Sequence, residues 1–365
     1  MSLDLTKSSA YVDKTAYEIW QETEGVPIYT GLAIDDLRTA RLGPWKRKGV
    51  LGAFINLLGA GRSCDSYACE IPPKGETLPE RYLFEELIYV VSGRGATSIG
   101  WADGKKQTFE WQAGSLFSPP LNTWRQHFNG SGTEPARFIA VTTAPIVMNL
   151  FHNLDFIFKN PFEFRDRYTE ADDYFSGKGQ AYPGRIWDTN FVEDVRSIAL
   201  YEWKERGAGA RTVLIELCEN ILAALVSEFP VGTYKKAHRH GPGNHVIVLD
   251  GTGYSLMWQA GETPRKFDWH EGTIIVPPEN WFHQHFNGGP KPARYLALRW
   301  AGSKKFLGMR KVYGVDESTK QGGDQIEYED EDPNIHVDFE GALAPTGATC
   351  EMSAVHPFCS RKVAS

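Results

Sequence analysis

The chain contains one long segment twice. The run GSLFSPPLNTWRQHFNG, which begins at Gly114, is matched by GTIIVPPENWFHQHFNG, which begins at Gly272. The same offset pairs Trp45 with Trp203 and Glu70 with Glu228. A single register that holds from about residue 33 to 145, and again from about 191 to 303, predicts a tandem duplication of one domain.

Each copy has the pattern of β structure. The runs EELIYVVSGRGATSIGW and NHVIVLDGTGYSLMW are short apolar or alternating stretches that glycine-containing turns interrupt. Many short strands at regular spacing are typical of a sandwich or barrel, so the sequence predicts an all-β protein. Short helices are expected at residues 11–24, as a lead-in, and at residues 191–205.

The repeat also predicts the domain organisation. We expect a first domain with its helical lead-in over residues 1–145, a linker over 146–190 and a second domain over 191–303. Residues 304–365 are expected to form an extended C-terminal arm that packs on a barrel. The apolar residues available to anchor it are Ile326, Tyr328, Val337 and Phe339.

Charge and composition exclude several classes of partner. The net charge of −7 argues against nucleic acid and against an anionic membrane surface. No apolar run reaches the roughly 18 residues that span a bilayer, and the first residues lack the apolar core of a signal peptide. The five cysteines are odd in number and include no CxxC, which favours a reduced, cytoplasmic protein with its thiols buried.

The histidines are clustered in the second copy. Six of the ten lie between residues 238 and 285. Residues i and i+2 of a strand face the same side, so His238 projects with His240, and His283 projects with His285. Two such pairs from strands that meet inside a barrel can converge on one metal ion. Neutral imidazoles in a facial set leave coordination positions open.

The spacing around these histidines resembles that of the cupin superfamily. Gly232 stands five residues before His238-Arg239-His240, and Gly251 closes the first motif. The second motif is formed by Gly272, Pro278, Asn280, His283 and Asn287, and the first copy keeps much of the same frame. The resemblance is therefore to a bicupin. It implies a double-stranded β-helix, or jelly-roll barrel, in each half, short peripheral helices, and a metal held by His238, His240 and His283.

Two departures from the family pattern matter. The family glutamate falls on Asn244 or on His245, depending on how the spacing is counted, and His245 is either a further ligand or a hydrogen-bonded core residue. In the first copy Glu80, Tyr82 and Arg125 stand where the three histidines stand, and Glu86 takes the glutamate position. A guanidinium does not bind a cation, so we expect Arg125 to form an ion pair with Glu80 or Glu86. The first barrel is then expected to be metal-free and to serve stability or oligomerisation, with an anion site as the weaker alternative.

Other residues are candidates for the pocket. His285 has a counterpart in His127, which favours a structural role, although His285 is also a candidate substrate contact; His270 is expected to face solvent. The expected carboxylate clamp consists of Arg239 and Arg299. The aromatic wall is expected to come from Tyr254, Trp258, Trp281 and Trp300.

The resemblance also suggests a reaction. Bicupins similar to gentisate 1,2-dioxygenase have a three-histidine iron site, which implies a non-haem Fe(II) dioxygenase that acts with O₂ on a small aromatic or carboxylate substrate. A second hypothesis keeps the metal, as Mn, Ni or Zn, but makes the enzyme a decarboxylase, isomerase or lyase. A third is a non-catalytic bicupin. In each case we expect a homo-oligomer.

Overall fold

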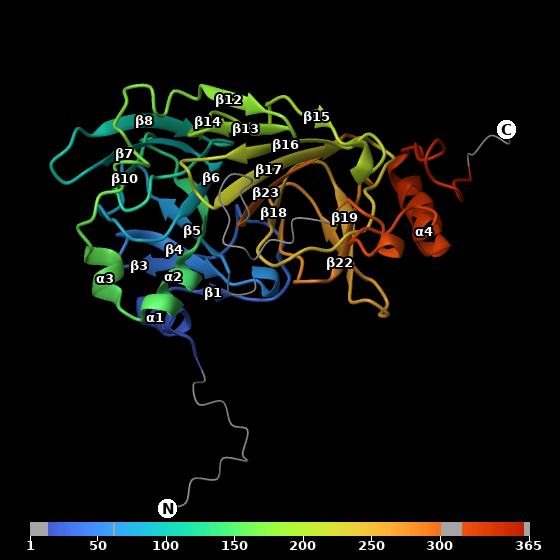
Figure 1. Cartoon of the computed structure of the whole chain (residues 1–365), viewed down its shortest axis with the longest axis horizontal. Helices are drawn as coiled ribbons and strands as arrows, with labels where there is room; N and C mark the ends of the chain where they lie inside the picture. Colours follow the sequence, from blue (N-terminus) through green and yellow to red (C-terminus); the bar gives the residue numbers. More distant parts are fainter. Residues whose placement is uncertain (1–13, 61–62, 301–315, 361–365) are drawn as a thin grey trace, which may run out of the picture.

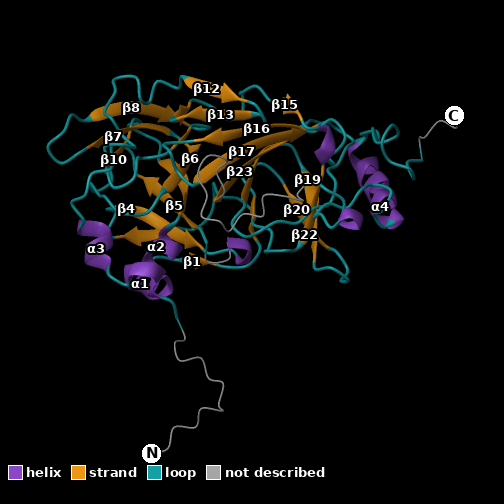
Figure 2. Cartoon of the chain, in the orientation of Figure 1, coloured by secondary structure: helices purple, strands orange, loops and turns teal. Residues whose placement is uncertain are grey.

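The computed structural model describes residues 14–60, 63–300 and 316–360, with the side chain of Trp300 outside the described part. Two β-barrels lie side by side along the long axis of the molecule (Figure 1). The helices lie at the periphery and the strands in the centre (Figure 2). The expected all-β fold of two jelly-roll barrels with short peripheral helices is confirmed.

The N-terminal barrel consists of two sheets. The larger has the order β1-β4-β5-β11-β6-β9-β14, with β3 beside β4, and the smaller has the order β10-β7-β8. The bounds of the larger sheet are β1 (Ile28–Tyr29), β3 (Gly43–Trp45), β4 (Val50–Ile55), β5 (Asp65–Ile71), β6 (Glu86–Ser92), β9 (Leu116–Phe117), β11 (Ala136–Thr142) and β14 (Phe191–Val192). Those of the smaller sheet are β7 (Arg94–Gly100), β8 (Gln107–Gln112) and β10 (Trp124–Asn129).

The C-terminal barrel repeats this topology. Its larger sheet runs β12-β13-β16-β17-β23-β18-β21-β2, with β15 beside β16, and its smaller sheet runs β20-β19-β22. The larger sheet is formed by β2 (Ala33–Ile34), β12 (Gly179–Tyr182), β13 (Ile186–Thr189), β15 (Tyr201–Glu202), β16 (Arg211–Glu216), β17 (Leu222–Phe229), β18 (His245–Asp250), β21 (Ile274–Ile275) and β23 (Ala293–Trp300). The smaller consists of β19 (Gly253–Trp258), β20 (Arg265–Trp269) and β22 (Phe282–Phe286).

The two barrels exchange their outermost strands. Strand β2, from the start of the chain, pairs with β21 of the C-terminal barrel, and β14 pairs with β9 of the N-terminal barrel. Strand β13, inside the stretch expected to be a linker, pairs in parallel with β16, as β1 does with β4. Strand pairing therefore crosses the boundaries that the repeat suggested at residues 145 and 191.

Equivalent arginines fix this exchange. Arg38 pairs with Asp36 and donates to the backbone oxygen of Glu271 at 2.8 Å. Arg196 pairs with Asp194 and donates to the backbone oxygen of Ala113 at 2.7 Å. A continuous apolar core joins the barrels, with buried side chains from both halves. The duplicated domains are consequently parts of one packed unit.

The helices agree only partly with expectation. Helix α1 (Ala16–Glu24) forms within the predicted lead-in and begins with a capping box, in which Thr15 and Glu18 bond each other's backbone. No helix spans residues 191–205, where the structure has β14, turns and β15; that prediction is wrong. Val192, Val195 and Leu200 have a helix-like spacing, but their side chains enter the core between the barrels.

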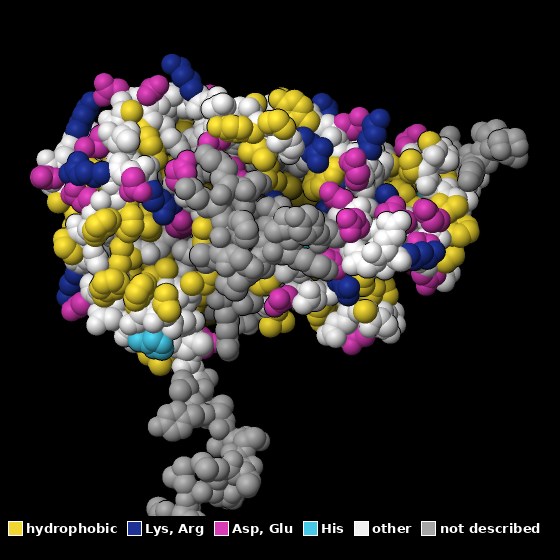
Figure 3. Space-filling view, viewed as in Figure 1, with side chains coloured by type: hydrophobic (Ala, Val, Ile, Leu, Met, Phe, Trp, Pro, Cys, Tyr) yellow, Lys and Arg dark blue, Asp and Glu magenta, His cyan; other side chains and the backbone are white. Residues whose placement is uncertain are grey.

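The remaining helices follow the barrels. Helices α2 (Ala144–Phe151) and α3 (Leu154–Lys159) follow the first. Exposed apolar side chains gather over α2 and α3 (Figure 3); they include Leu150, Phe151, Leu154 and Phe156. No helix in the described ranges is long and apolar enough to cross a membrane.

The C-terminal segment is not simply extended. It contains helix α4 (Pro333–Leu343) and packs on the outer face of the C-terminal barrel (Figure 1). Tyr328 and Phe339 are buried as expected, and Ile326 packs against Trp258 and Phe282. Val337, by contrast, is 60% exposed and is not an anchor.

Candidate metal centre

Three imidazoles converge inside the C-terminal barrel. His238 and His283 are bridge partners, and their ring centroids are 4.3 Å apart, while those of His240 and His283 are 4.5 Å apart. One nitrogen from each ring lies within 4.8 Å of the others. Each Nδ1 lies within 3.3 Å of a backbone oxygen, namely those of Lys236, Gly241 and Trp281. That arrangement directs the Nε2 atoms towards a common point, as in metal sites.

Burial keeps these rings neutral. It lowers the pKa of His240 to about 4, with Arg299 contributing, although the bond to Gly241 opposes the shift. Burial and the charge of Arg206 bring the pKa of His238 well below its usual value, and burial does the same for His283. A neutral imidazole offers a lone pair, so the three residues fit a divalent cation at neutral pH.

The two candidates for the missing glutamate have different positions. The Nδ2 atom of Asn244 lies 2.7 Å from Nε2 of His240, at the edge of the imidazole group. His245 is opposite Leu298 and shares its face of β18 with Ile247, which belongs to the core between the barrels. It is fully buried, and the three-imidazole group does not include it. The structure therefore brings Asn244, and not His245, to the site.

A set of buried cations beside the imidazoles was not anticipated. Arg206 is 4% exposed and ion-pairs with Asp316 at 3.1 Å. Lys235 is 2% exposed, and its Nζ donates to Tyr295 Oη at 2.9 Å. The ring of Tyr295 lies 5.4 Å from that of His285. The repeat contained part of this signal, because Arg206 is matched by Lys48, which is also buried.

Arg299 and Trp281 lie on the inner side of the barrel. Arg299 belongs to the face of β23 that includes Tyr295, and its charge acts on His240. Trp281 packs with Met257 and Val248 in the cluster inside the barrel. Their roles as part of a clamp and of a wall stay predictions.

Three other predicted pocket residues face away. Strand register places Tyr254 and Trp258 opposite Phe286 and Phe282, whereas Met257 is opposite His283. Tyr254 and Trp258 are thus on the outer face, under the C-terminal segment. Arg239 also points outwards and pairs with Asp324 at 2.9 Å. The period-2 pattern groups Tyr254 and Trp258 on one face of the strand. The sequence did not show that the C-terminal segment covers this face.

His285 and His127 make matching contacts. Trp269 Nε1 donates to Ser255 Oγ at 3.1 Å, and that hydroxyl lies 2.7 Å from His285 Nδ1. In the first barrel Trp111 donates to Thr97, which lies 2.8 Å from His127 Nδ1. This repetition supports the structural interpretation of His285.

His270 is the last of the histidines singled out in the sequence. Its side chain is 42% exposed and lies 3.3 Å from Asp35. It has no part in the site.

The corresponding place in the N-terminal barrel is occupied by ionic and hydrogen-bonded side chains. Arg125 lies 3.3 Å from Glu86, over the ring of Tyr82, and Lys48 pairs with Glu80. Tyr67 and Tyr82 both donate to Glu86. Burial alone would raise the pKa of Glu86, but Lys48, Arg125 and these bonds lower it. Of the two partners expected for Arg125, the structure selects Glu86.

Comparison with known proteins identifies the class of fold. No family model matches the chain, and no curated protein matches it. Among solved structures, an arginine-to-alanine variant of Bacillus subtilis oxalate decarboxylase matches with a TM-score of 0.50 and 12% identity, over 84% of this chain and 88% of that one. A formate complex of Lactobacillus farciminis oxalate decarboxylase matches with a TM-score of 0.49 and 12% identity, over 75% of this chain and 87% of that one. The chain therefore has the bicupin fold.

These matches correct the expected reaction class. We expected an oxidoreductase of the ring-cleaving dioxygenase kind, resembling gentisate 1,2-dioxygenase, with iron and O₂. That prediction is wrong, since the structures that share the fold are decarboxylases. The expectation of iron depended on that reaction class and is no longer supported.

Proposed function

We propose that the protein is a metal-dependent bicupin lyase that acts, without net oxidation, on a small carboxylate in its C-terminal barrel. The observation that carries this proposal is the convergence of three neutral imidazoles, two buried and one half-buried, beside buried cationic side chains. The neighbours' name, oxalate decarboxylase, agrees with a reaction of this class. The charges of Arg206, Lys235 and Arg299 favour an anionic ligand.

The proposed roles follow from the contacts. A divalent cation held by His238, His240 and His283 would supply a Lewis acid for a carboxylate oxygen. The backbone oxygens at Nδ1 hold the rings in place. A set of imidazoles with open positions accepts several first-row ions, so we leave manganese, nickel and zinc as candidates.

Tyr295 is the proposed proton donor. Burial acts to raise its pKa, but the adjacent Lys235 ammonium lowers it below the ordinary value. In a decarboxylation the carbon–carbon bond breaks, neutral CO₂ leaves, and the bonding electron pair stays on the remaining carbon, which takes a proton from Tyr295 Oη and leaves it as a phenolate. Solvent then returns that proton. The first barrel has Phe138 at the corresponding position, which makes the donor specific to the C-terminal barrel.

The test is turnover of metal-loaded protein. Protein loaded separately with Mn²⁺, Ni²⁺ or Zn²⁺ is supplied with oxalate and other small di- and keto-acids, in air and under argon, and products are followed by NMR. We expect release of CO₂ with one ion, and loss of turnover and of the barrel's metal ion in His283→Ala. His270→Ala, the same change at an exposed histidine, should behave as wild type. Silence with every ion and acid, or unchanged metal binding in His283→Ala, would refute the proposal.

A further inference from the structure

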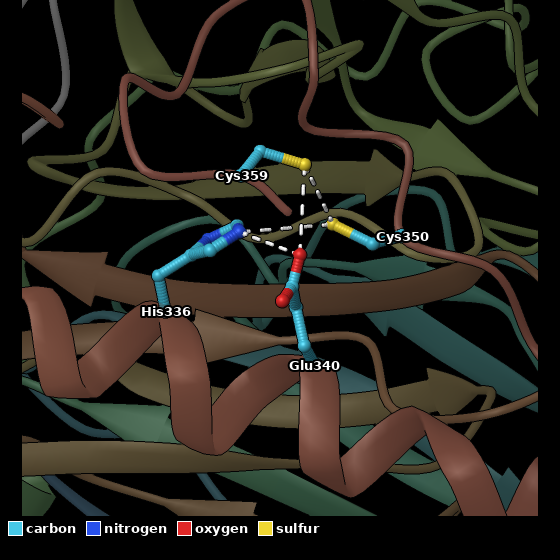
Figure 4. A group of neighbouring side chains, drawn as sticks. All are labelled: His336, Glu340, Cys350 and Cys359. Carbon is cyan, nitrogen blue, oxygen red and sulfur yellow. Dashed lines mark hydrogen bonds and ion pairs between the residues drawn. The ribbon is translucent and has the colours of Figure 1, made fainter. Parts of the chain in front are cut away.

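Four potential metal ligands meet in the C-terminal segment, far along the chain from the barrel histidines. They are His336 and Glu340 of α4, together with Cys350 and Cys359 from the coil that follows (Figure 4). Their side chains point towards one another, and one donor atom from each lies within 4.8 Å of the others. His336, Cys350 and Cys359 are at most 6% exposed. Helix α4 brings His336 and Glu340 together, because residues i and i+4 share one face of a helix.

We propose that these four residues form a structural zinc site that fastens the C-terminal segment. Four of the distances between donor atoms are close to the edges of a ligand tetrahedron around zinc. The two Sγ atoms are 3.6 Å apart, Cys350 Sγ lies 3.9 Å from His336 Nε2, Cys359 Sγ lies 3.6 Å from Glu340 Oε1, and His336 Nε2 lies 3.2 Å from that oxygen. Zinc at about 2.3 Å from sulfur and about 2.0–2.2 Å from nitrogen or oxygen requires edges of roughly 3.3–3.8 Å.

The surroundings of His336 fit a zinc ligand. Its Nδ1 lies 3.0 Å from the hydroxyl of Tyr234, which donates its own proton to Glu331. The hydroxyl therefore accepts from Nδ1–H, and the lone pair of Nε2 is left for an ion between Glu340 Oε1, at 3.2 Å, and Cys350 Sγ, at 3.9 Å. In a second group, Glu331, His336 and His356, His356 Nε2 lies 2.8 Å from Glu331, and the rings of His336 and His356 are stacked with their centroids 3.9 Å apart. We interpret it as the support that orients His336.

The donor set indicates the ion and its role. Two thiols, an imidazole and a carboxylate are typical of zinc, and the protein supplies all four positions, as in structural sites. Burial raises the pKa of Cys350 to about 12, so Cys350 is a thiol before the ion enters. Binding would replace two S–H bonds by two S–Zn bonds and release two protons to solvent, without any change of oxidation state.

The site would stabilise the outer wall of the metal-binding barrel. Glu331 accepts a bond from Gln284 at 2.9 Å, and Gln284 lies between His283 and His285 on β22. The C-terminal segment thus reaches the back of the strand that carries the barrel ligand. This inference is independent of the proposed reaction, because a structural site would exist whatever the barrel does.

Cobalt substitution of the full chain separates the two sites. Thiolate ligands give Co²⁺ a near-ultraviolet charge-transfer band, and the barrel group offers only nitrogen and oxygen donors. We expect the band in the wild type and in His283→Ala, and its loss in Cys350→Ser and Cys359→Ser, with one zinc fewer per chain by elemental analysis. Cys218→Ser, which replaces a buried thiol bonded to the Ser118 oxygen, is the matched control and should keep the band.

A second measurement does not depend on the variants folding. Titration of the wild type with a mercurial thiol reagent, in the presence of a zinc indicator, should release one zinc as the Cys350 and Cys359 thiols react. Three results would overturn the proposal: no charge-transfer band in the wild type, a band that persists in Cys359→Ser, or a Cys350–Cys359 disulfide in freshly isolated protein.

Discussion

Arg125 occupies in the N-terminal barrel the place that His283 occupies in the C-terminal barrel, and its guanidinium lies 3.3 Å from Glu86. Both side chains are almost completely buried. The two barrels thus have equivalent positions whose side chains differ in charge. In one, neutral imidazoles are available for a cation; in the other, a protein cation already compensates a carboxylate. The first three predictions concern the buried ion pair, the metal site of the C-terminal barrel, and the exchanged strands that connect the two barrels.

Breaking the buried pair should strongly destabilise the protein. Glu86→Gln leaves Arg125 with its compensating charge removed, so the free energy of unfolding should fall by about 3–5 kcal/mol. Asp155→Asn, in the exposed pair with Lys159, is the control and should change it by less than about 1 kcal/mol. The double replacement Glu86→Leu with Arg125→Met should lower the free energy of unfolding by less than Glu86→Gln alone. Urea unfolding measures all three, and equal effects of the buried and exposed changes would contradict this account.

Asn244 should limit the affinity of the barrel for metal. In Asn244→Glu, a carboxylate lies beside His240, where the amide Nδ2 now lies 2.7 Å from Nε2. An anionic oxygen ligand should bind Mn²⁺ at least ~10-fold more tightly, which corresponds to about 1.4 kcal/mol. Isothermal titration calorimetry of the variant and of Asn244→Leu makes the comparison. Tighter binding by the leucine variant would show that Asn244 does not adjoin the ion.

The exchanged strands should make the two barrels unfold together. Arg137 donates to Glu70 and to backbone oxygens of the residues that follow β2, and Arg294 makes the equivalent contacts with Glu228 and the residues after β14. Arg137→Met should therefore lower the unfolding temperature of the whole chain, while calorimetry still shows one transition. Lys105→Met, at an exposed ion pair, is the control. Two separate transitions would indicate independent barrels.

The sequence contained most of the fold but not its connections. The repeat predicted two like domains and the strand pattern predicted β structure, while the jelly-roll barrels and the metal ligands His238 and His283 were implied by the resemblance to the cupin superfamily. The exchange of Ala33–Ile34 with Phe191–Val192 involves strands of two residues, which are too short to produce a pattern. Arg206 and Lys235 were missed for another reason: a lone basic residue in a sequence does not indicate that it is buried.

The cysteines illustrate the same limit. Cys350 and Cys359 are nine residues apart and lack the CxxC signature, so the sequence suggested only buried thiols. Their relation to His336 and Glu340 depends on the path of the coil after α4. The spacing His-x₃-Glu on a helix was the one local signal, and a helix was not expected in that segment.

The last prediction concerns acid stability and His127. Burial lowers the pKa of His127 to about 3 in the folded protein, against 6.5 for an ordinary histidine. Its Nδ1 is already hydrogen-bonded to Thr97 Oγ1, at 2.8 Å, inside the barrel. Above about pH 6.5 the residue is neutral in both states and makes no pH-dependent contribution. As the pH falls below that value only the unfolded chain gains the proton, and the folded state loses about 1.4 kcal/mol per pH unit until the folded pKa is reached.

His127→Gln removes this one titration while keeping a side chain of similar size. Between pH 7 and pH 5 the variant should therefore lose about 2 kcal/mol less stability than the wild type, whatever its stability at pH 7. His270→Gln controls for removal of a surface histidine. Urea unfolding at a series of pH values provides the slopes. Parallel slopes for wild type and His127→Gln would mean that His127 gains its proton in the folded barrel, which the burial of the ring argues against.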